Sequence, residues 1–139
     1  MHQNPDPDTI RDTLQGARTV AVVGLSDKPY RTSHAIARTL QKLGYRIFPV
    51  NPNLKGPVLG ENPYSSVREV EEPIDIVNVF RRSAFVPPVA EDAVAAGAGA
   101  LWMQLGVIND EAATYASQHG LTVVMDRCIK VDHASLIGR

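Results

Sequence analysis

Five short apolar runs, separated by segments with helical spacing, constrain the fold of this chain more than any other feature. The runs lie at residues 19–24, 46–50, 74–80, 100–105 and 121–125. They are nearly continuously apolar, as expected of parallel strands that are covered on both faces. Between them, the spacing predicts helices at 33–43, 84–96 and 109–119, and a shorter helix at 65–70.

Alternating strands and helices favour right-handed crossovers and a parallel sheet. We therefore predict an α/β fold, a Rossmann-like three-layer sandwich whose five-stranded parallel sheet has the order 3-2-1-4-5. In that order the ligand crevice lies outside the carboxyl ends of strands one and four. The length suits a single domain spanning 1–139. An N-terminal helix at 8–15, within residues 1–17, is expected on its edge.

Composition argues against several other classes of protein. The chain is 44% hydrophobic and 21% charged, with a formal net charge of −1, so neither disorder nor nucleic-acid binding is expected. A single cysteine excludes a disulfide framework, and no His or carboxylate cluster predicts a metal site. The N-terminus lacks the pattern of a signal peptide, and no apolar run could span a membrane. We expect a cytoplasmic protein without a membrane partner.

The loop after the first run, VVGLSDKPYRTS, contains the residue types that hold phosphate. Gly24 lets the backbone turn sharply and approach a ligand closely. The following helix offers free N–H groups and the positive end of its dipole. Ser26 can donate its hydroxyl, while Lys28 and Arg31 add positive charge. Ser33 can either contact the ligand or cap the helix.

Two departures argue against a dinucleotide. A dinucleotide loop normally carries three glycines and an acidic residue after strand two, for the ribose hydroxyls. Here the loop has only Gly24, and strand two ends at Asn51-Pro52. A Walker phosphate loop is also missing from the sequence. These departures count against an NAD(P)-binding oxidoreductase or redox sensor without excluding it, so we keep it as the alternative function.

Several segments together resemble a known family. They are VVGLSDKPYRTS, VNP at 50–52, DIVNVFRRS at 75–83, WMQLGVINDEAA at 102–113 and MDRC at 125–128. The chain resembles the small stand-alone CoA-binding domain proteins, which are similar in turn to the CoA-binding domain of the succinyl-CoA synthetase alpha subunit. The resemblance implies a Rossmann-like domain that binds coenzyme A or acyl-CoA. It also allows a CoA-binding subunit whose ligase domains lie on another chain.

The resemblance also implies which residues face the cofactor. It assigns Gly24, Leu25, Ser26 and Lys28 to the phosphate side, Asn51 and Pro52 to the adenosine end, Val79, Phe80 and Arg81 to the adenine and ribose, and Gln104, Leu105 and Gly106 to the pantetheine arm. The ligase chemistry of the larger synthetases needs a further domain with a phosphorylated histidine and is not transferred. We expect a non-catalytic binding protein, and a homodimer is plausible on general grounds.

Three further residues have two readings each. Cys128 is either a thiol near the CoA thiol or a small buried residue. Asp126 and Arg127 are either a catalytic pair or part of a local ion pair. The sequence also suggests that Gly24→Val would abolish binding and leave the fold largely intact.

Overall fold

The computed structural model describes residues 1–138 and has the predicted α/β architecture. The parallel strands are β1 (Thr19–Val23), β2 (Arg46–Val50), β3 (Ile76–Val79), β4 (Ala100–Met103) and β5 (Thr122–Met125). The helices are α1 (Pro7–Gly16), α2 (Thr32–Lys42), α3 (Val86–Ala95), α4 (Asp110–Gln118) and α5 (Ile129–Leu136). Two single 3₁₀ turns, η1 (Val67–Glu69) and η2 (Ser83–Phe85), precede β3 and α3. Within residues 1–138, no helix is long and apolar enough to cross a membrane.

The order of the strands is β2-β1-β3-β4-β5, so the predicted order 3-2-1-4-5 is wrong in detail. The chain does wind one way from β1 and then reverse, but the reversal comes one strand earlier. The switch point therefore lies between β1 and β3. Pro49 gives the physical reason. Because proline has no N–H to donate to a second neighbouring strand, β2 is suited to the edge position. On that edge, the Tyr64 N–H donates to the Pro49 carbonyl at 2.8 Å.

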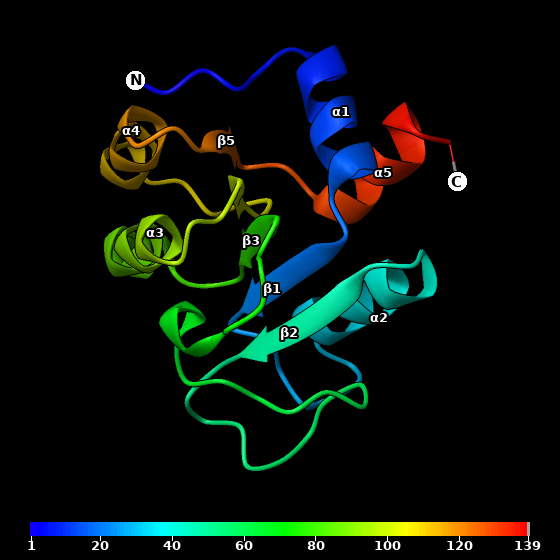
Figure 1. Cartoon of the computed structure of the whole chain (residues 1–139). Coiled ribbons are helices and arrows are strands. Elements are labelled where there is room, and N and C mark those ends of the chain that lie inside the picture. The colour runs from blue at the N-terminus through cyan, green and yellow to red at the C-terminus, as the bar shows by residue number, and fades with distance from the viewer. Residues whose placement is uncertain (139) are drawn as a thin grey trace.

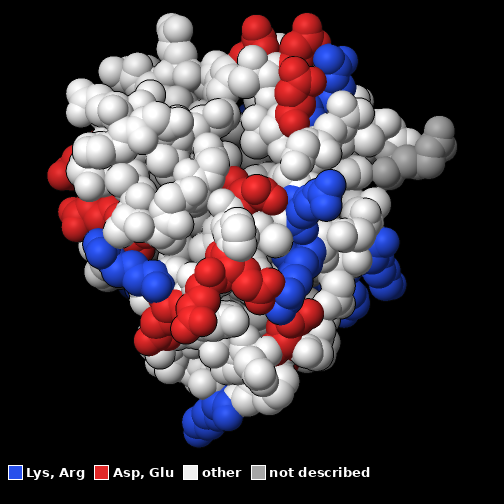
Figure 2. Space-filling view, viewed as in Figure 1, with Lys and Arg blue, Asp and Glu red and all other residues white. Residues whose placement is uncertain are grey.

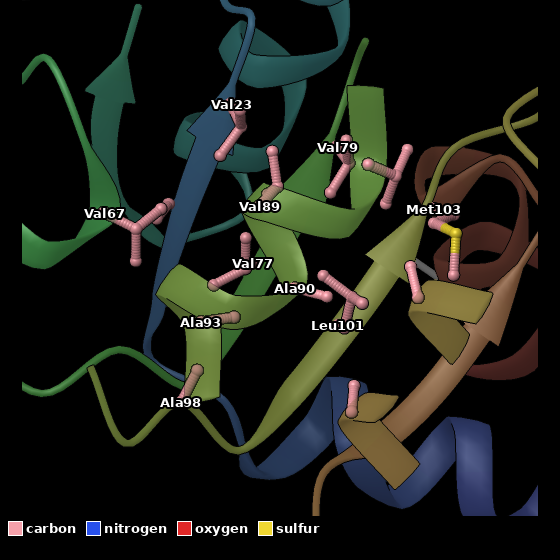
Figure 3. Close-up of a cluster of buried hydrophobic side chains, with 14 of the residues drawn as sticks. Val23, Val67, Val77, Val79, Val89, Ala90, Ala93, Ala98, Leu101 and Met103 are labelled. Atoms are coloured by element: carbon pink, nitrogen blue, oxygen red, sulfur yellow. The ribbon is translucent and has the colours of Figure 1, made fainter. Parts of the chain in front are cut away.

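Helices cover both faces of the sheet (Figure 1). The α3 and α4 helices, with η1, pack on one face, and α1, α2 and α5 pack on the other. Successive strand residues point to opposite faces, so Val77 belongs to the first core and Ile76 to the second. In Figure 3, Ala90 and Ala93 of α3 lie over Val77 and Leu101. Their small side chains let α3 pack closely on the sheet.

The N-terminal helix predicted at 8–15 is present as α1, and it packs on one face of the sheet. Ile10 and Leu14 of α1 are buried in the core that α2 and α5 also cover. The Tyr45 hydroxyl also donates to the Leu14 carbonyl at 2.5 Å. The helix starts after Asp6, whose carboxylate accepts from the Thr9 N–H at 2.8 Å. Its apolar stripe makes α1 part of the domain core.

The last helix, α5, has no counterpart in the sequence prediction. Its N-cap residue is Cys128, whose side chain makes no capping hydrogen bond, so the usual start signal is missing. Tertiary contacts hold the helix instead. Ile129 is fully buried, and the buried Asp132 carboxylate accepts two hydrogen bonds from Arg127 at 2.7 and 2.8 Å. Arg127 therefore forms a local ion pair, and its partner is Asp132 of α5.

Charges of both signs are interspersed on the face seen in Figure 2. Asp and Glu side chains form a band across its lower middle, with Lys and Arg side chains beside them. This face therefore offers no broad basic surface of the kind that nucleic acid needs.

Gly24, directly after β1, is required by the fold itself. Its φ is +87°, a conformation that other residues adopt at a cost. A Cβ atom added there would overlap the main-chain carbonyl oxygen of Phe80, at the end of β3. The Gly24 N–H meanwhile donates to the Val50 carbonyl at 2.8 Å. The expectation that Gly24→Val leaves the fold largely intact is therefore wrong.

We expect Gly24→Ala to lower the free energy of unfolding by about 2 kcal/mol or more, because it adds both backbone strain and a steric overlap. Urea denaturation measures this change. Gly16→Ala is the matched control, since its φ is ordinary and no atom lies within 4 Å of an added Cβ. Equal midpoints for the two variants would contradict the proposed overlap.

Burial of His133 gives a pH dependence. Desolvation lowers the pKa of His133 below its ordinary value of 6.5, and its ring packs edge-on against Tyr45 with centroids 5.9 Å apart. The unfolded chain therefore binds the proton more readily than the folded chain does. We expect stability to fall as the pH drops through about 6.5. Substituting His133→Phe should weaken that fall, measured by urea denaturation between pH 8 and pH 5, and an unchanged slope would contradict it.

Candidate functional site

The loops after β1, β2 and β3 meet at the switch point and enclose a cleft of about 510 Å³. A cleft of this size is typical of small-molecule sites. The residues that line it are Gly24, Ser26, Asp27, Lys28, Arg31, Thr32, Ser33, Asn51, Asn53, Leu54 and Phe80. The structure therefore brings together most of the predicted phosphate loop with one residue from each of the next two predicted segments.

The N-terminus of α2 opens onto this cleft without a side-chain cap. The helix starts at Thr32, and Arg31 is its N-cap residue. Within the described chain, the Arg31 side chain makes no capping hydrogen bond. The positive end of the helix dipole thus lies beside the exposed cations Lys28 and Arg31. This arrangement suits an anionic group such as phosphate.

Two serines organise the loop between β1 and α2. The Ser26 N–H donates to Ser33 Oγ at 3.0 Å, and the Lys28 N–H donates to Ser26 Oγ at 3.0 Å. Both hydroxyl oxygens therefore act as acceptors within the loop, which leaves their O–H groups to donate elsewhere. Ser33 is buried, and so is His34, whose Nδ1 lies 2.9 Å from the Ser26 carbonyl oxygen. His34 thus holds the loop from within the protein.

Asn51 joins two of the loops that form the cleft. Its Nδ2 donates to the Leu25 carbonyl at 3.0 Å, and its Oδ1 accepts from the Asn53 N–H at 3.0 Å. The side chain of Leu25 is fully buried in the core, as is that of Val79. Leu25 and Val79, which the resemblance assigned to the cofactor, therefore face the core with their side chains.

A smaller cleft of about 200 Å³ lies on the other side of the same strand ends, towards α3. Consecutive residues point to opposite sides: Gly24, Asn51 and Phe80 line the larger cleft, and Val23, Pro52 and Arg81 line the smaller one. The guanidinium carbon of Arg81 lies 5.5 Å from the centroid of the Phe85 ring.

The predicted segment after β4 lies outside both clefts. Gln104 is buried, and its Oε1 accepts from Asn78 Nδ2 and from the Ile129 N–H, each at 3.3 Å. This side chain connects β3, β4 and α5 inside the protein. The Oδ1 atom of Asn78 is the one buried side-chain polar atom within residues 1–138 that lacks a hydrogen-bond partner.

The next two residues of that segment lie near Cys128. Leu105 is 67% exposed and lines a separate depression of about 210 Å³ together with Cys128 and Asp126. The Gly106 N–H donates to Asp126 Oδ1 at 2.7 Å. Cys128 is half-buried, so its thiol lies beside this depression and not in the main cleft.

Sequence reasoning missed four residues that line the larger cleft. Asp27 and Thr32 lie within the phosphate loop, and Asn53 and Leu54 follow Asn51-Pro52 directly. Position along the chain could have indicated three of them, because Asp27, Thr32 and Asn53 are each next to a predicted contact. Leu54 lines the cleft only because the loop after β2 turns back towards α2, and no local sequence pattern predicts that turn. No group of three His, Cys, Asp or Glu residues in the described part of the chain could hold a metal ion.

Comparison with known proteins places this geometry in context. The family model described as "CoA binding domain" matches residues 18–134. The protein YneT of Bacillus subtilis is 48% identical over 132 residues, which cover 95% of this chain and 97% of YneT. The alpha subunit of an ADP-forming acetate–CoA ligase from Pyrococcus furiosus is 34% identical over 88 residues. That match covers 58% of this chain but only 19% of the ligase subunit.

A solved structure agrees with these sequence matches. A protein from Pyrococcus horikoshii superposes with a TM-score of 0.92 at 31% identity, covering 99% of this chain and 100% of the other. The matched region contains β1 to β5 and the whole of the larger cleft. The chain belongs to the CoA binding domain family.

Proposed function

We propose that this protein binds coenzyme A or acyl-CoA in the cytoplasm and catalyses no reaction by itself. The observation that carries the proposal is the uncapped N-terminus of α2, which opens with Lys28 and Arg31 onto the larger cleft. CoA carries a pyrophosphate and a further phosphate, and its charge matches this positive end. Membership of the CoA binding domain family supports the same ligand.

The two clefts suggest how the nucleotide part lies. Phosphate oxygens at the α2 N-terminus would accept from the O–H groups of Ser26 and Ser33, whose oxygens are already engaged as acceptors. Leu54 and Phe80 give the same cleft apolar walls, which suit a purine ring. Beyond Gly24, Arg81 supplies a third cation in the smaller cleft. The ligand would then run across the carboxyl ends of the strands, from the larger cleft to the smaller one.

A nicotinamide dinucleotide fits this cleft less well. A dinucleotide site uses a carboxylate after β2 to accept the ribose hydroxyls. Asn51 stands there instead, and its amide already bonds Leu25 and Asn53 with both ends. An uncharged amide also accepts ribose hydroxyls more weakly than a carboxylate does. This arrangement favours CoA over the alternative of an NAD(P)-dependent oxidoreductase or redox sensor.

A second candidate is a CoA-binding subunit of an acyl-CoA ligase. It is favoured by the similarity to an ADP-forming acetate–CoA ligase alpha subunit, of which this chain matches a small part. In that case the remaining steps need groups from another polypeptide. Binding of CoA by the isolated chain is common to both candidates, whereas acyl-CoA formation with a separate ligase chain would favour the second.

Isothermal titration tests the ligand and the site together. We expect CoA to bind, and Lys28→Gln or Arg31→Gln to weaken it about tenfold each, because each removes one charge-assisted contact. Lys42→Gln is the matched control, since Lys42 lies at the opposite end of the same helix. It should leave the affinity unchanged.

Two results would contradict this assignment. Micromolar binding of NAD without binding of CoA would favour the oxidoreductase alternative. Equal affinities for CoA in the wild-type chain and the Lys28 and Arg31 variants would place the phosphates elsewhere.

The hydroxyl of Ser33 provides a second test. Ser33→Ala removes the acceptor for the Ser26 N–H, so the phosphate loop loses one internal hydrogen bond worth about 1 kcal/mol. We expect weaker CoA binding together with a small loss of stability, measured by titration and urea denaturation. Ser117→Ala, on the exposed surface of α4, is the control for a serine far from the cleft. If Ser33→Ala binds CoA like the control, the serine network has no role in binding.

A further inference from the structure

The β5 strand forms the edge of the sheet opposite β2. The backbone groups on its outer side make no hydrogen bonds to β4. The N–H groups of Thr122 and Asp126 donate to Gly99 and Met103, towards β4. Because a strand alternates, the N–H and C=O groups of Val123 and Met125 point away from the sheet. An exposed row of this kind can pair with another strand.

Residues 2–4, here called the N-terminal strap, cover this edge. The Asn4 carboxamide binds Met125 at two points: Oδ1 accepts from the Met125 N–H at 2.8 Å, and Nδ2 donates to the Met125 carbonyl at 2.9 Å. His2 Nε2 lies 3.0 Å from the Val123 carbonyl oxygen. The His2 N–H also donates to Asp110 Oδ1 at 2.8 Å, which ties the strap to α4. Figure 1 shows this segment running past α4 and β5 before it reaches α1.

The strap pairs with β5 through side chains and not as a strand. Residues 2–4 have no strand conformation. Asn4 nevertheless makes with Met125 the two hydrogen bonds that a residue of a neighbouring antiparallel strand would make. A strand on this edge and the strap are therefore mutually exclusive.

The outward groups of β5 are complementary to those of a second β5. In an antiparallel pair related by a two-fold axis, Met125 lies opposite Val123 of the other copy, and each such pair exchanges two hydrogen bonds. Neither Pro nor a charged residue interrupts β5, whose sequence is TVVM. The strap occupies the backbone groups of Met125 and the carbonyl of Val123, which this pairing needs.

We propose that the strap closes β5 to a second copy of this chain. When it is released, two copies pair through β5 and form one continuous sheet. The CoA cleft lies at the loops after β1, β2 and β3, so the proposal does not depend on the ligand.

The test compares the full chain with a variant that lacks residues 1–5 and keeps the Asp6 cap of α1. Light scattering during size-exclusion chromatography gives the molar mass over a range of concentrations. We expect the truncated chain to reach about twice the mass of the full chain. The pair His2→Ala with Asn4→Ala should act in the same direction, whereas Gln3→Ala, which removes no hydrogen bond among the described residues, should behave like the full chain.

Hydrogen exchange at the Met125 amide identifies the surface involved. In the truncated chain this amide should be exposed at low concentration and protected at high concentration. An unchanged mass in both the truncated chain and the double variant would overturn the proposal. A doubled mass with an unprotected Met125 amide would also overturn it, because another surface would then form the dimer.

Discussion

At Gly24 the ends of three strands meet with no room for a side chain. Its N–H donates to the Val50 carbonyl at the end of β2, and its Cα faces the carbonyl of Phe80, directly after β3. The Phe80 N–H in turn donates to the Val23 carbonyl at 2.8 Å. This junction fixes where the loops after β1, β2 and β3 leave the sheet. Because those loops form the larger cleft, the geometry of the site depends on the same close approach that stabilises the fold.

The cleft combines hydrogen-bonded loops with exposed positive charge. Ser33, His34 and Asn51 use their polar groups to hold the loops from the protein side. Lys28 and Arg31 remain at the open side, next to the uncapped N-terminus of α2. A bound phosphate would add the negative charge that this end of the helix lacks. Ser33 can serve in both ways, because its Oγ accepts from the Ser26 N–H while its O–H group remains free to donate to a ligand.

The sequence predicted the lining of the larger cleft better after β1 than after β4. The phosphate loop is local: its glycine, serines and cations lie within ten residues, so their proximity follows from chain connectivity alone. Gln104 carries no such local information. Its amide is enclosed by Asn78 of β3 and the first N–H of α5, which are distant in sequence. The residues after β4 therefore line a different depression, which the family resemblance by itself did not separate from the main cleft.

The sequence by itself determined the five strands, the three central helices and the loop between β1 and α2, because periodicity and helix signals depend on neighbouring residues. The tertiary structure decided which strands pair, where α1 packs, and whether residues 129–136 form a helix. Those outcomes depend on hydrogen bonds and buried contacts between distant segments. The sequence analysis placed strand two inside the sheet, whereas β2 with its Pro49 lies at the edge, and the side of β1 on which β3 lies emerges only when the whole sheet assembles.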